Sequence, residues 1–270
     1  MPASLASIID ATRRSLSLRK NGDQRALERM AAGHAPRGFR KRLEQAAAAG
    51  EIAVIAELKK ASPSRGLIRT DFRPFELARD LEKAGAAALS ILTDEPFFQG
   101  SLEYLREAST ATSLPCLRKD FIVDKFQIVE ARANRADAVL LIVAALEQRE
   151  LAALAAGARM YGMDVLCEAH DEDELNRALD AGCDLIGINS RNLHTFEVDL
   201  RTAFRLVEKI PEACVAVAES GIHSGADLGQ LRAAGYDAFL IGESLMKEAR
   251  PGEALASLLD AARAEARPEC

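Results

Sequence analysis

Residues 164–189, DVLCEAHDEDELNRALDAGCDLIGIN, contain one complete strand–helix–strand unit. DVLCEA (164–169) and LIGIN (185–189) are short apolar runs bounded by polar or small residues, which is typical of buried parallel strands. Between them, Leu175, Ala178 and Leu179 recur at helical spacing, and Gly182 follows as the glycine that often ends a helix. The stretch therefore predicts a helix that crosses between two parallel strands.

The same unit recurs along most of the chain, at intervals of about 20–35 residues. Eight strand-like runs in this pattern, with no long linker, favour a closed (β/α)8 TIM barrel. The competing architecture is an open doubly wound sheet, which usually carries GxGxxG after its first strand. The turn here reads KKASPSRG (59–66) and does not match. The runs are IAVIAEL (52–58), AAALSIL (86–92), PCLRK (115–119), AVLLIV (138–143), DVLCEA (164–169), LIGIN (185–189), CVAVAE (214–219) and AFLIG (238–242).

The first 48 residues differ from the rest in their sequence pattern, which is that of helices without strand-like runs. Leu5, Ile8 and Ile9 form one helical stripe, and RRSLSLRK (13–20) follows as an expected solvated helix face. Further helices are expected over 23–32 and over 36–49, the latter with Pro36 in its first turn. We therefore expect an α/β chain with an N-terminal helical extension (1–48) packed on a barrel catalytic domain (49–270).

Composition and charge exclude several classes of protein. Hydrophobic residues make up 49% and charged residues 28%, which is too apolar for a disordered chain. The net charge of −6 argues against a general nucleic-acid surface. The longest apolar run, 138–146, is far shorter than the ~20 residues of a membrane span, and no signal peptide is evident. We expect a cytoplasmic protein with no nucleic-acid or membrane partner.

Cysteine and histidine usage argues against disulfides and metals. The five cysteines (116, 167, 183, 214 and 270) include no CxxC, and the four histidines form no HxH or HExxH pair. We therefore expect buried free thiols in a reducing compartment and no metal.

Polar residues gather where the expected strands end, which is where such barrels carry their active sites. Glu57 and Lys59 share the parity of Ala53 and Ile55 and so project to one face of their strand. Arg118 has the opposite parity to Lys119 and is expected to point away from the barrel centre. Solvated rim charges are the alternative, but buried Lys and Glu are seldom tolerated unpaired. Further polar groups at strand ends are Lys119, Glu168, Asn189, the pair Glu219-Ser220 and Glu243.

The last two strands are followed by glycine turns, AESGI (218–222) and LIGESLM (240–246). Barrels of this class often bind phosphate at these two positions through backbone N–H groups. Plain tight turns are the alternative, but their joint occurrence favours a phosphate site.

Seven ordered blocks across residues 50–246 resemble the indole-3-glycerol phosphate synthase family, and the N-terminal extension resembles the extra helices of that family. The resemblance implies that 1-(2-carboxyphenylamino)-1-deoxyribulose 5-phosphate undergoes ring closure, loses CO₂ and water, and becomes indole-3-glycerol phosphate in tryptophan biosynthesis. It implies a lyase that needs no cofactor or metal. The blocks are AELKKASPSRG (56–66), LRKDFIVDKFQI (117–128), AVLLIVAAL (138–146), VLCEAHDEDEL (165–175), IGINSRNLHTFEVDL (186–200), VAESGI (217–222) and FLIGESLM (239–246).

The resemblance also implies roles for individual residues. Lys119 matches the acid that protonates the ketone oxygen, and Lys59 matches a second lysine that pairs with the substrate carboxylate or assists loss of the hydroxyl. Glu168 matches the general base of the dehydration. Glu57 and Asn189 match residues that orient the substrate amine and hydroxyls, and Ser220 matches a polar contact in the same mouth. The residues on the phosphate side are Ser62, Gly221, Gly242 and Glu243. Those around the anthranilate ring and its carboxylate are Phe121, Arg191 and Leu193. For Glu243 we expect the backbone N–H to contribute while the side chain points away.

Two other functions remain open at this stage. A phosphosugar isomerase barrel would share the phosphate turns but would not need Glu57, Lys59, Lys119 and Glu168 together. A non-catalytic barrel that senses a phosphorylated ligand is the other alternative. We expect a monofunctional, monomeric enzyme whose partner is a small phosphorylated substrate.

Overall fold

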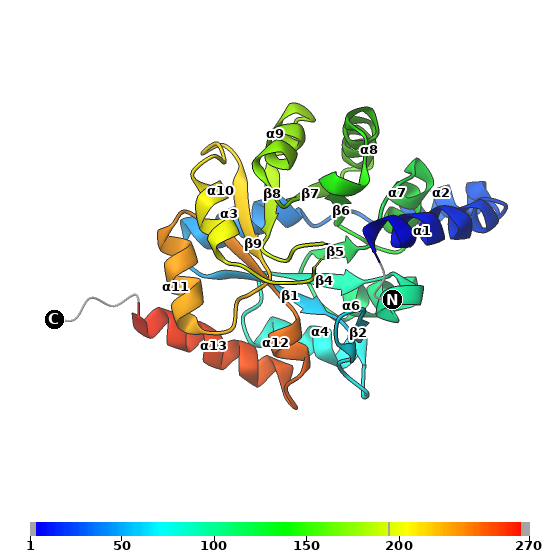
Figure 1. Cartoon of the computed structure of the whole chain (residues 1–270). Helices are drawn as coiled ribbons and strands as arrows, with labels where there is room; N and C mark the ends of the chain where they lie inside the picture. Colours follow the sequence, from blue (N-terminus) through cyan, green and yellow to red (C-terminus); the bar gives the residue numbers. More distant parts are fainter. Residues whose placement is uncertain (1–3, 194, 266–270) are drawn as a thin grey trace.

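Eight parallel strands close into a barrel with helices around its outside (Figure 1). The computed structural model describes residues 4–193 and 195–265. The strands pair in the cyclic order β1-β10-β9-β8-β7-β6-β5-β4, which confirms the predicted TIM barrel. All eight strand-like runs form these strands: β1 (Ala53–Leu58), β4 (Ala88–Leu92), β5 (Cys116–Lys119), β6 (Ala138–Ile142), β7 (Asp164–Ala169), β8 (Leu185–Asn189), β9 (Val215–Glu219) and β10 (Ala238–Ile241).

Helices follow the strands, and several of them begin at a polar side chain that caps the first turn. Asp171, for example, accepts a hydrogen bond from the backbone N–H of Glu174 and so starts the helix inside the stretch that opened the sequence analysis. A two-strand hairpin, β2 (Ala61–Ser62) with β3 (Gly66–Leu67), shapes the loop after β1. The helices are α4 (Pro74–Lys83), α5 (Glu95–Phe98), α6 (Leu102–Ala111), α7 (Lys125–Ala133), the 3-10 segment η1 (Val143–Ala145), α8 (Gln148–Met160), α9 (Glu172–Asp180), α10 (Arg201–Val207), α11 (Gly225–Ala233), α12 (Glu243–Met246) and α13 (Pro251–Glu265).

The apolar core has two layers because side chains alternate across each strand. Residues of one parity, such as Ile55, Leu117 and Leu166, fill the barrel interior. Residues of the other parity pack outward against the helices. Arg118 belongs to the outer set and is fully buried against α7, where it binds Glu130, so the prediction that it points away from the barrel centre is confirmed.

Three helices precede the barrel: α1 (Leu5–Arg19), α2 (Gln24–Ala32) and α3 (Phe39–Ala48). In Figure 1, α1 lies at the end toward which the strand arrowheads point, and α3 lies toward the opposite end. Phe39 and Leu43 of α3 are fully buried and pack with the barrel interior, so α3 closes the amino-terminal end.

Two predictions for this segment are wrong in detail. The third helix begins at Phe39 and not at Pro36, because Gly38 adopts a φ of +72° and the backbone N–H of Arg37 donates to Asp137 Oδ1 at 2.8 Å. The basic stretch 13–20 is not wholly solvated. Arg19 binds Glu130 at 2.7 Å, and the next residue pairs with Asp124 just before α7.

The prediction of free thiols throughout is also wrong. Cys167 of β7 and Cys183 form a disulfide, with their Cα atoms 6.5 Å apart. Cys183 lies just before β8, which pairs with β7, so the pairing of consecutive strands brings together two cysteines that are 16 residues apart. Cys116 and Cys214 are free thiols as predicted, and Cys270 lies outside the described residues.

Candidate active site

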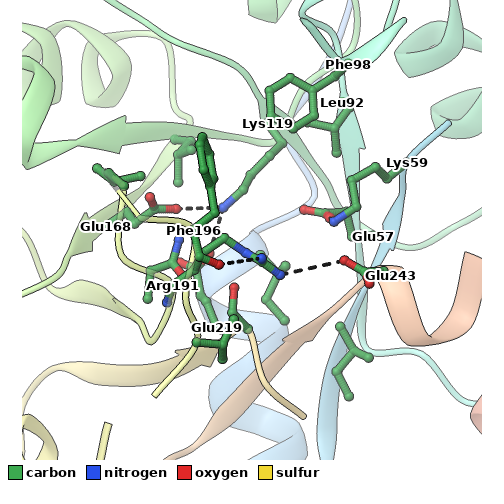
Figure 2. Close-up of a pocket in the computed structure, with 18 of the residues that line it drawn as sticks. Glu57, Lys59, Leu92, Phe98, Lys119, Glu168, Arg191, Phe196, Glu219 and Glu243 are labelled. Atoms are coloured by element: carbon green, nitrogen blue, oxygen red, sulfur yellow. Dashed lines mark hydrogen bonds and ion pairs between the residues drawn. The ribbon is translucent and has the colours of Figure 1, made fainter. Parts of the chain in front are cut away.

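A pocket of about 460 Å³ opens at the carboxyl ends of the barrel strands. Because every parallel strand ends there, all eight barrel strands contribute residues to one cavity, part of which Figure 2 shows. Ser62 is the one predicted site residue that does not line it; it is buried in β2, and its hydroxyl faces Ser64. The predicted residues that do line the pocket are Glu57, Lys59, Lys119, Phe121, Glu168, Asn189, Arg191, Leu193, Ser220, Gly221, Gly242 and Glu243.

Lys119 lies between two buried carboxylates. Its Nζ donates to Glu168 Oε2 at 2.8 Å and to Glu219 Oε2 at 2.6 Å. The three groups come from β5, β7 and β9, and Figure 2 shows them facing one another across the pocket floor. The ammonium thus holds two glutamates that would otherwise repel each other.

The shared lysine moves the pKa values of the two glutamates in opposite directions. Burial raises the pKa of Glu168, but Lys119 and His170 outweigh it, and the net pKa lies well below its usual range. Burial also raises the pKa of Glu219, and repulsion from Glu168 adds to it, so the net value is about 7 despite the attraction of Lys119. Burial opposes the charge of Lys119, but Glu168, Glu219 and Glu57 outweigh it and raise the pKa of the ammonium.

Sequence reasoning noted Glu219 at a strand end but did not assign it to the site. Glu219 is 1% exposed, and its Oε1 has no hydrogen-bond partner in the described structure. A Cβ on Gly187 of β8 would overlap this oxygen, so the glycine makes room for the carboxylate. The sequence did indicate that Glu219 faces the barrel interior, since it shares the parity of Val215 and Val217, whose side chains point inward.

Glu57 and Lys59 form a second pair, 2.7 Å apart, at the end of β1. Glu57 is 4% exposed and lies over Gly242, where a Cβ would overlap its Oε1. Gly242 is therefore required for a close approach of Glu57, a role that the phosphate interpretation of this glycine did not include.

A third ionic group lies at the rim. Glu243 contacts Arg65 Nε at 2.9 Å and Arg191 Nη2 at 3.7 Å (Figure 2 shows the latter). The Glu243 side chain thus lines the pocket beside two guanidinium groups, and the expectation that it points away from a bound phosphate stays a prediction. Nearby, Ser220 has a φ of +67° and Gly221 a φ of +81°, a left-handed turn that is costly for Ser220.

Apolar side chains form the remaining walls. Phe98, after β4, pairs with Phe121 at a ring-centroid distance of 6.1 Å, and Phe196 lies on the opposite loop. Leu5 and Ile8 of α1 also line the pocket. The sequence predicted the helical stripe of α1 but not its place at the site, because periodicity does not say which surface a helix covers.

Metal-binding geometry is not found in this pocket or elsewhere: over residues 4–193 and 195–265, no three His, Cys, Asp or Glu side chains are placed to hold an ion.

Comparison with known proteins identifies the family. A family model described as indole-3-glycerol phosphate synthase matches residues 5–258. An indole-3-glycerol phosphate synthase of Koribacter versatilis (strain Ellin345) is 57% identical over 260 residues, covering 96% of this chain and 100% of the relative. One of Aromatoleum aromaticum (strain DSM 19018 / LMG 30748 / EbN1) is 53% identical, covering 83% of this chain and 86% of the relative. The chain belongs to the indole-3-glycerol phosphate synthase family. The resemblance stated from the sequence is thereby confirmed. The family match supports neither of the two alternatives, the phosphosugar isomerase or the non-catalytic sensor.

More distant solved structures share only the barrel. Thiamine phosphate pyrophosphorylase from Pyrococcus furiosus superposes with a TM-score of 0.61 at 15% identity, covering 80% of this chain and 98% of that one. A mandelate oxidase mutant superposes with a TM-score of 0.58 at 17% identity, covering 79% and 72%. Both support the fold of this indole-3-glycerol phosphate synthase family member, and neither bears on its substrate.

Proposed function

We propose that this chain converts 1-(2-carboxyphenylamino)-1-deoxyribulose 5-phosphate into indole-3-glycerol phosphate, CO₂ and water. Membership of the family supports the reaction. The observation that carries the assignment to this pocket is the placement of Lys119 between Glu168 and Glu219, beside an aromatic wall.

Ring closure requires the aromatic carbon that bears the carboxylate to attack the sugar ketone. The ketone oxygen gains negative charge and must take a proton to become a hydroxyl. Lys119 is suited to give this proton, because it stays charged between its glutamates and points into the cavity. Loss of CO₂ then returns the bonding electrons to the ring. A positioned acid of this kind contributes ~10²–10⁴ in rate.

Dehydration forms the indole double bond. The hydroxyl leaves as water with one added proton, and a base removes one proton from the ring that is being formed. Glu168 is suited to be this base because it is ionised at neutral pH and shares a pocket with Lys59, which would assist the departing hydroxyl. Glu57 and Asn189 would orient the amine and the hydroxyl groups.

The two anionic groups of the substrate fit the cations at the mouth. We assign the ring carboxylate to Lys59 and Arg191, with Phe121 and Leu193 against the ring. We assign the phosphate to the turns at Gly221 and Gly242, with Glu243 beside them. Ser62, which the resemblance also implies for the phosphate, does not line the pocket. On this assignment, bound substrate takes the place of Glu57 as partner of Lys59 and of Glu243 as partner of Arg191. In the free enzyme these ion pairs hold the two cations in position for the substrate.

The N-terminal extension (1–48) is proposed to serve this site as part of the barrel unit (49–270). This is supported by Leu5 and Ile8, which line the pocket, and by α3, which closes the opposite end of the barrel. We further propose a monofunctional, cytoplasmic monomer without nucleic-acid partners. No helix over residues 4–193 and 195–265 is both long and apolar enough to cross a membrane.

Indole fluorescence tests the proposal directly. The chain contains no tryptophan, so the appearance of the indole product is measured against a low background. We expect product from the wild-type chain and none from Lys119→Ala. Lys209→Ala is the control, since Lys209 is exposed and pairs with Glu172 outside the pocket. The proposal fails if the wild-type chain forms no indole from this substrate at high enzyme concentration.

A further inference from the structure

We propose that His170 is a positioning residue that holds Glu168 in place for catalysis. Its ring lies between Glu168 and Glu174, an arrangement that we call the clamp, and its charge attracts one oxygen of Glu168 while Lys119 binds the other. This inference deepens the proposed function and rests on it, because Glu168 is taken to be the base of the dehydration.

The contacts of His170 account for both oxygens of Glu168. His170 directly follows β7, and its Nε2 lies 3.4 Å from Glu168 Oε1. Glu168 Oε2 accepts from Lys119 at 2.8 Å. On the other side of the ring, His170 Nδ1 lies 2.9 Å from Glu174 Oε2, which also accepts the backbone N–H of His170 at 2.8 Å. The ring is thereby fixed at Nδ1 by a hydrogen bond, while Nε2 lies at ion-pair distance from Glu168 and has no hydrogen-bond partner in the described structure.

The charge of His170 follows from the partners of its ring. Glu174 can only accept a hydrogen bond when ionised, so Nδ1 carries a proton. Nε2 lies 3.4 Å from the ionised Glu168, and a carboxylate at this distance favours the charged ring. The side chain is 13% exposed, so little water is available to replace either partner. Burial disfavours the charge, but the contacts with Glu168 and Glu174 outweigh it and raise the pKa of His170 to about 10.

Few other ionisable groups face this clamp. Lys119 and Glu219 lie beyond Glu168 on the pocket side. Asp171 is engaged in capping α9 through the N–H of Glu174. The neighbouring strands β6 and β8 and the segment η1 carry no ionisable side chain. The electrostatics of Glu168 therefore depend on two cations, Lys119 and His170.

Loss of the His170 charge changes Glu168 in two ways. Oε1 belongs to a carboxylate that is only 2% exposed, and it would lose its facing cation. The pKa of Glu168 then rises, since removal of an opposite charge at this distance moves a carboxyl pKa by about 1–3. The base also becomes free to turn away from Lys119. Substrate binding through the phosphate and the ring would be unaffected, so kcat falls while KM stays near its wild-type value.

The test compares pH profiles of kcat for the wild-type chain, His170→Gln and Glu174→Gln. We expect the acid limb of His170→Gln to move up by about 1–3 pH units. Glu174→Gln, a change at a partly exposed position on α9, is expected to move it less but in the same direction. His34→Gln is the matched control. His34 is more deeply buried than His170, 6% against 13% exposed, and lies 3.0 Å from Asp137 Oδ1, away from the pocket, so its loss should leave the profile in place.

Two results would overturn the inference: a His170→Gln profile that superimposes on the wild type, or a kcat loss that is the same at every pH. NMR titration of the His170 ring in the wild-type chain tests the clamp without turnover. We expect the ring to stay protonated above pH 8, and a neutral ring at pH 7 would refute the clamp. If the wild-type chain forms no indole, the proposed function fails, while the titration still decides the clamp.

Discussion

Replacing Glu219 with glutamine should stabilise the folded chain at alkaline pH while lowering its activity. The folded chain keeps this carboxyl 1% exposed and beside a second glutamate, and its pKa is raised to about 7. The unfolded chain has no such environment, and the pKa there is near 4.5. Ionisation of Glu219 therefore costs free energy in the folded chain but not in the unfolded chain.

The magnitude follows from this difference in pKa. Between pH 4.5 and 7 the folded chain binds more protons than the unfolded chain, so the free energy of unfolding falls as the pH rises. A difference of about 2.5 in pKa corresponds to about 3 kcal/mol at pH 8. Glutamine cannot ionise, so Glu219→Gln removes this loss. The variant should match the wild type near pH 5 and exceed it by about 3 kcal/mol at pH 8.

Urea unfolding followed by circular dichroism at several pH values measures this effect. Glu168→Gln is the matched control, since it makes the same change on the other partner of Lys119. The pKa of Glu168 is lowered, so its ionised form stabilises the folded chain above the ordinary carboxyl pKa, and glutamine there should destabilise at pH 8. Our reasoning is refuted if the two variants shift stability in the same direction, or if the effect of Glu219→Gln is independent of pH.

Three further predictions concern the site and its support. In single-turnover kinetics, Lys119→Ala should abolish ring closure, whereas Glu168→Gln should close the ring and accumulate an intermediate; a normal first step in the lysine variant would contradict the assignment. Gly242→Ala should displace Glu57 and lower kcat by about 100-fold with the fold intact by circular dichroism, and an unchanged kcat would show that the close contact is not needed. Asp137→Asn should reduce the free energy of unfolding by about 3–5 kcal/mol, because this fully buried carboxylate binds the segment before α3; urea unfolding would show a smaller loss if the contact were dispensable.

Strand positions and their inward faces were predictable from the sequence alone. Alternation places Glu57 and Lys119 inside the barrel with the same certainty as their apolar neighbours, and the strand boundaries agree to within two residues. Short buried strands in a regular repeat leave little freedom in register, because a shift by one residue would move every inward side chain, Glu57 and Lys119 included, into the layer that faces the helices.

Partners across the barrel were not predictable, because they depend on which strands become neighbours in space. The disulfide joins Cys167 of β7 to Cys183 just before β8, and Lys119 of β5 contacts Glu219 of β9. The start of α3 depends on a hydrogen bond from Arg37 to a residue 100 positions away, and no local pattern reports it. Periodicity describes one element at a time, whereas these features belong to pairs of elements.

The proton balance of the proposed reaction gives a reason for two glutamates on one lysine. The ketone oxygen gains one proton, the departing water takes another, and the base removes one, so each turnover needs two donors and one acceptor. Lys119 is one donor and Glu168 the acceptor, which leaves Lys59 or Glu219 as the second donor. The pH dependence of the dehydration distinguishes these two candidates. Glu219 has a pKa of about 7, so it loses the proton that it would donate as the pH rises through neutrality. If Glu219 donates, the dehydration rate falls above pH 7 and Glu219→Gln is slow at every pH. A wild-type dehydration rate that stays constant up to pH 9 would assign the step to Lys59.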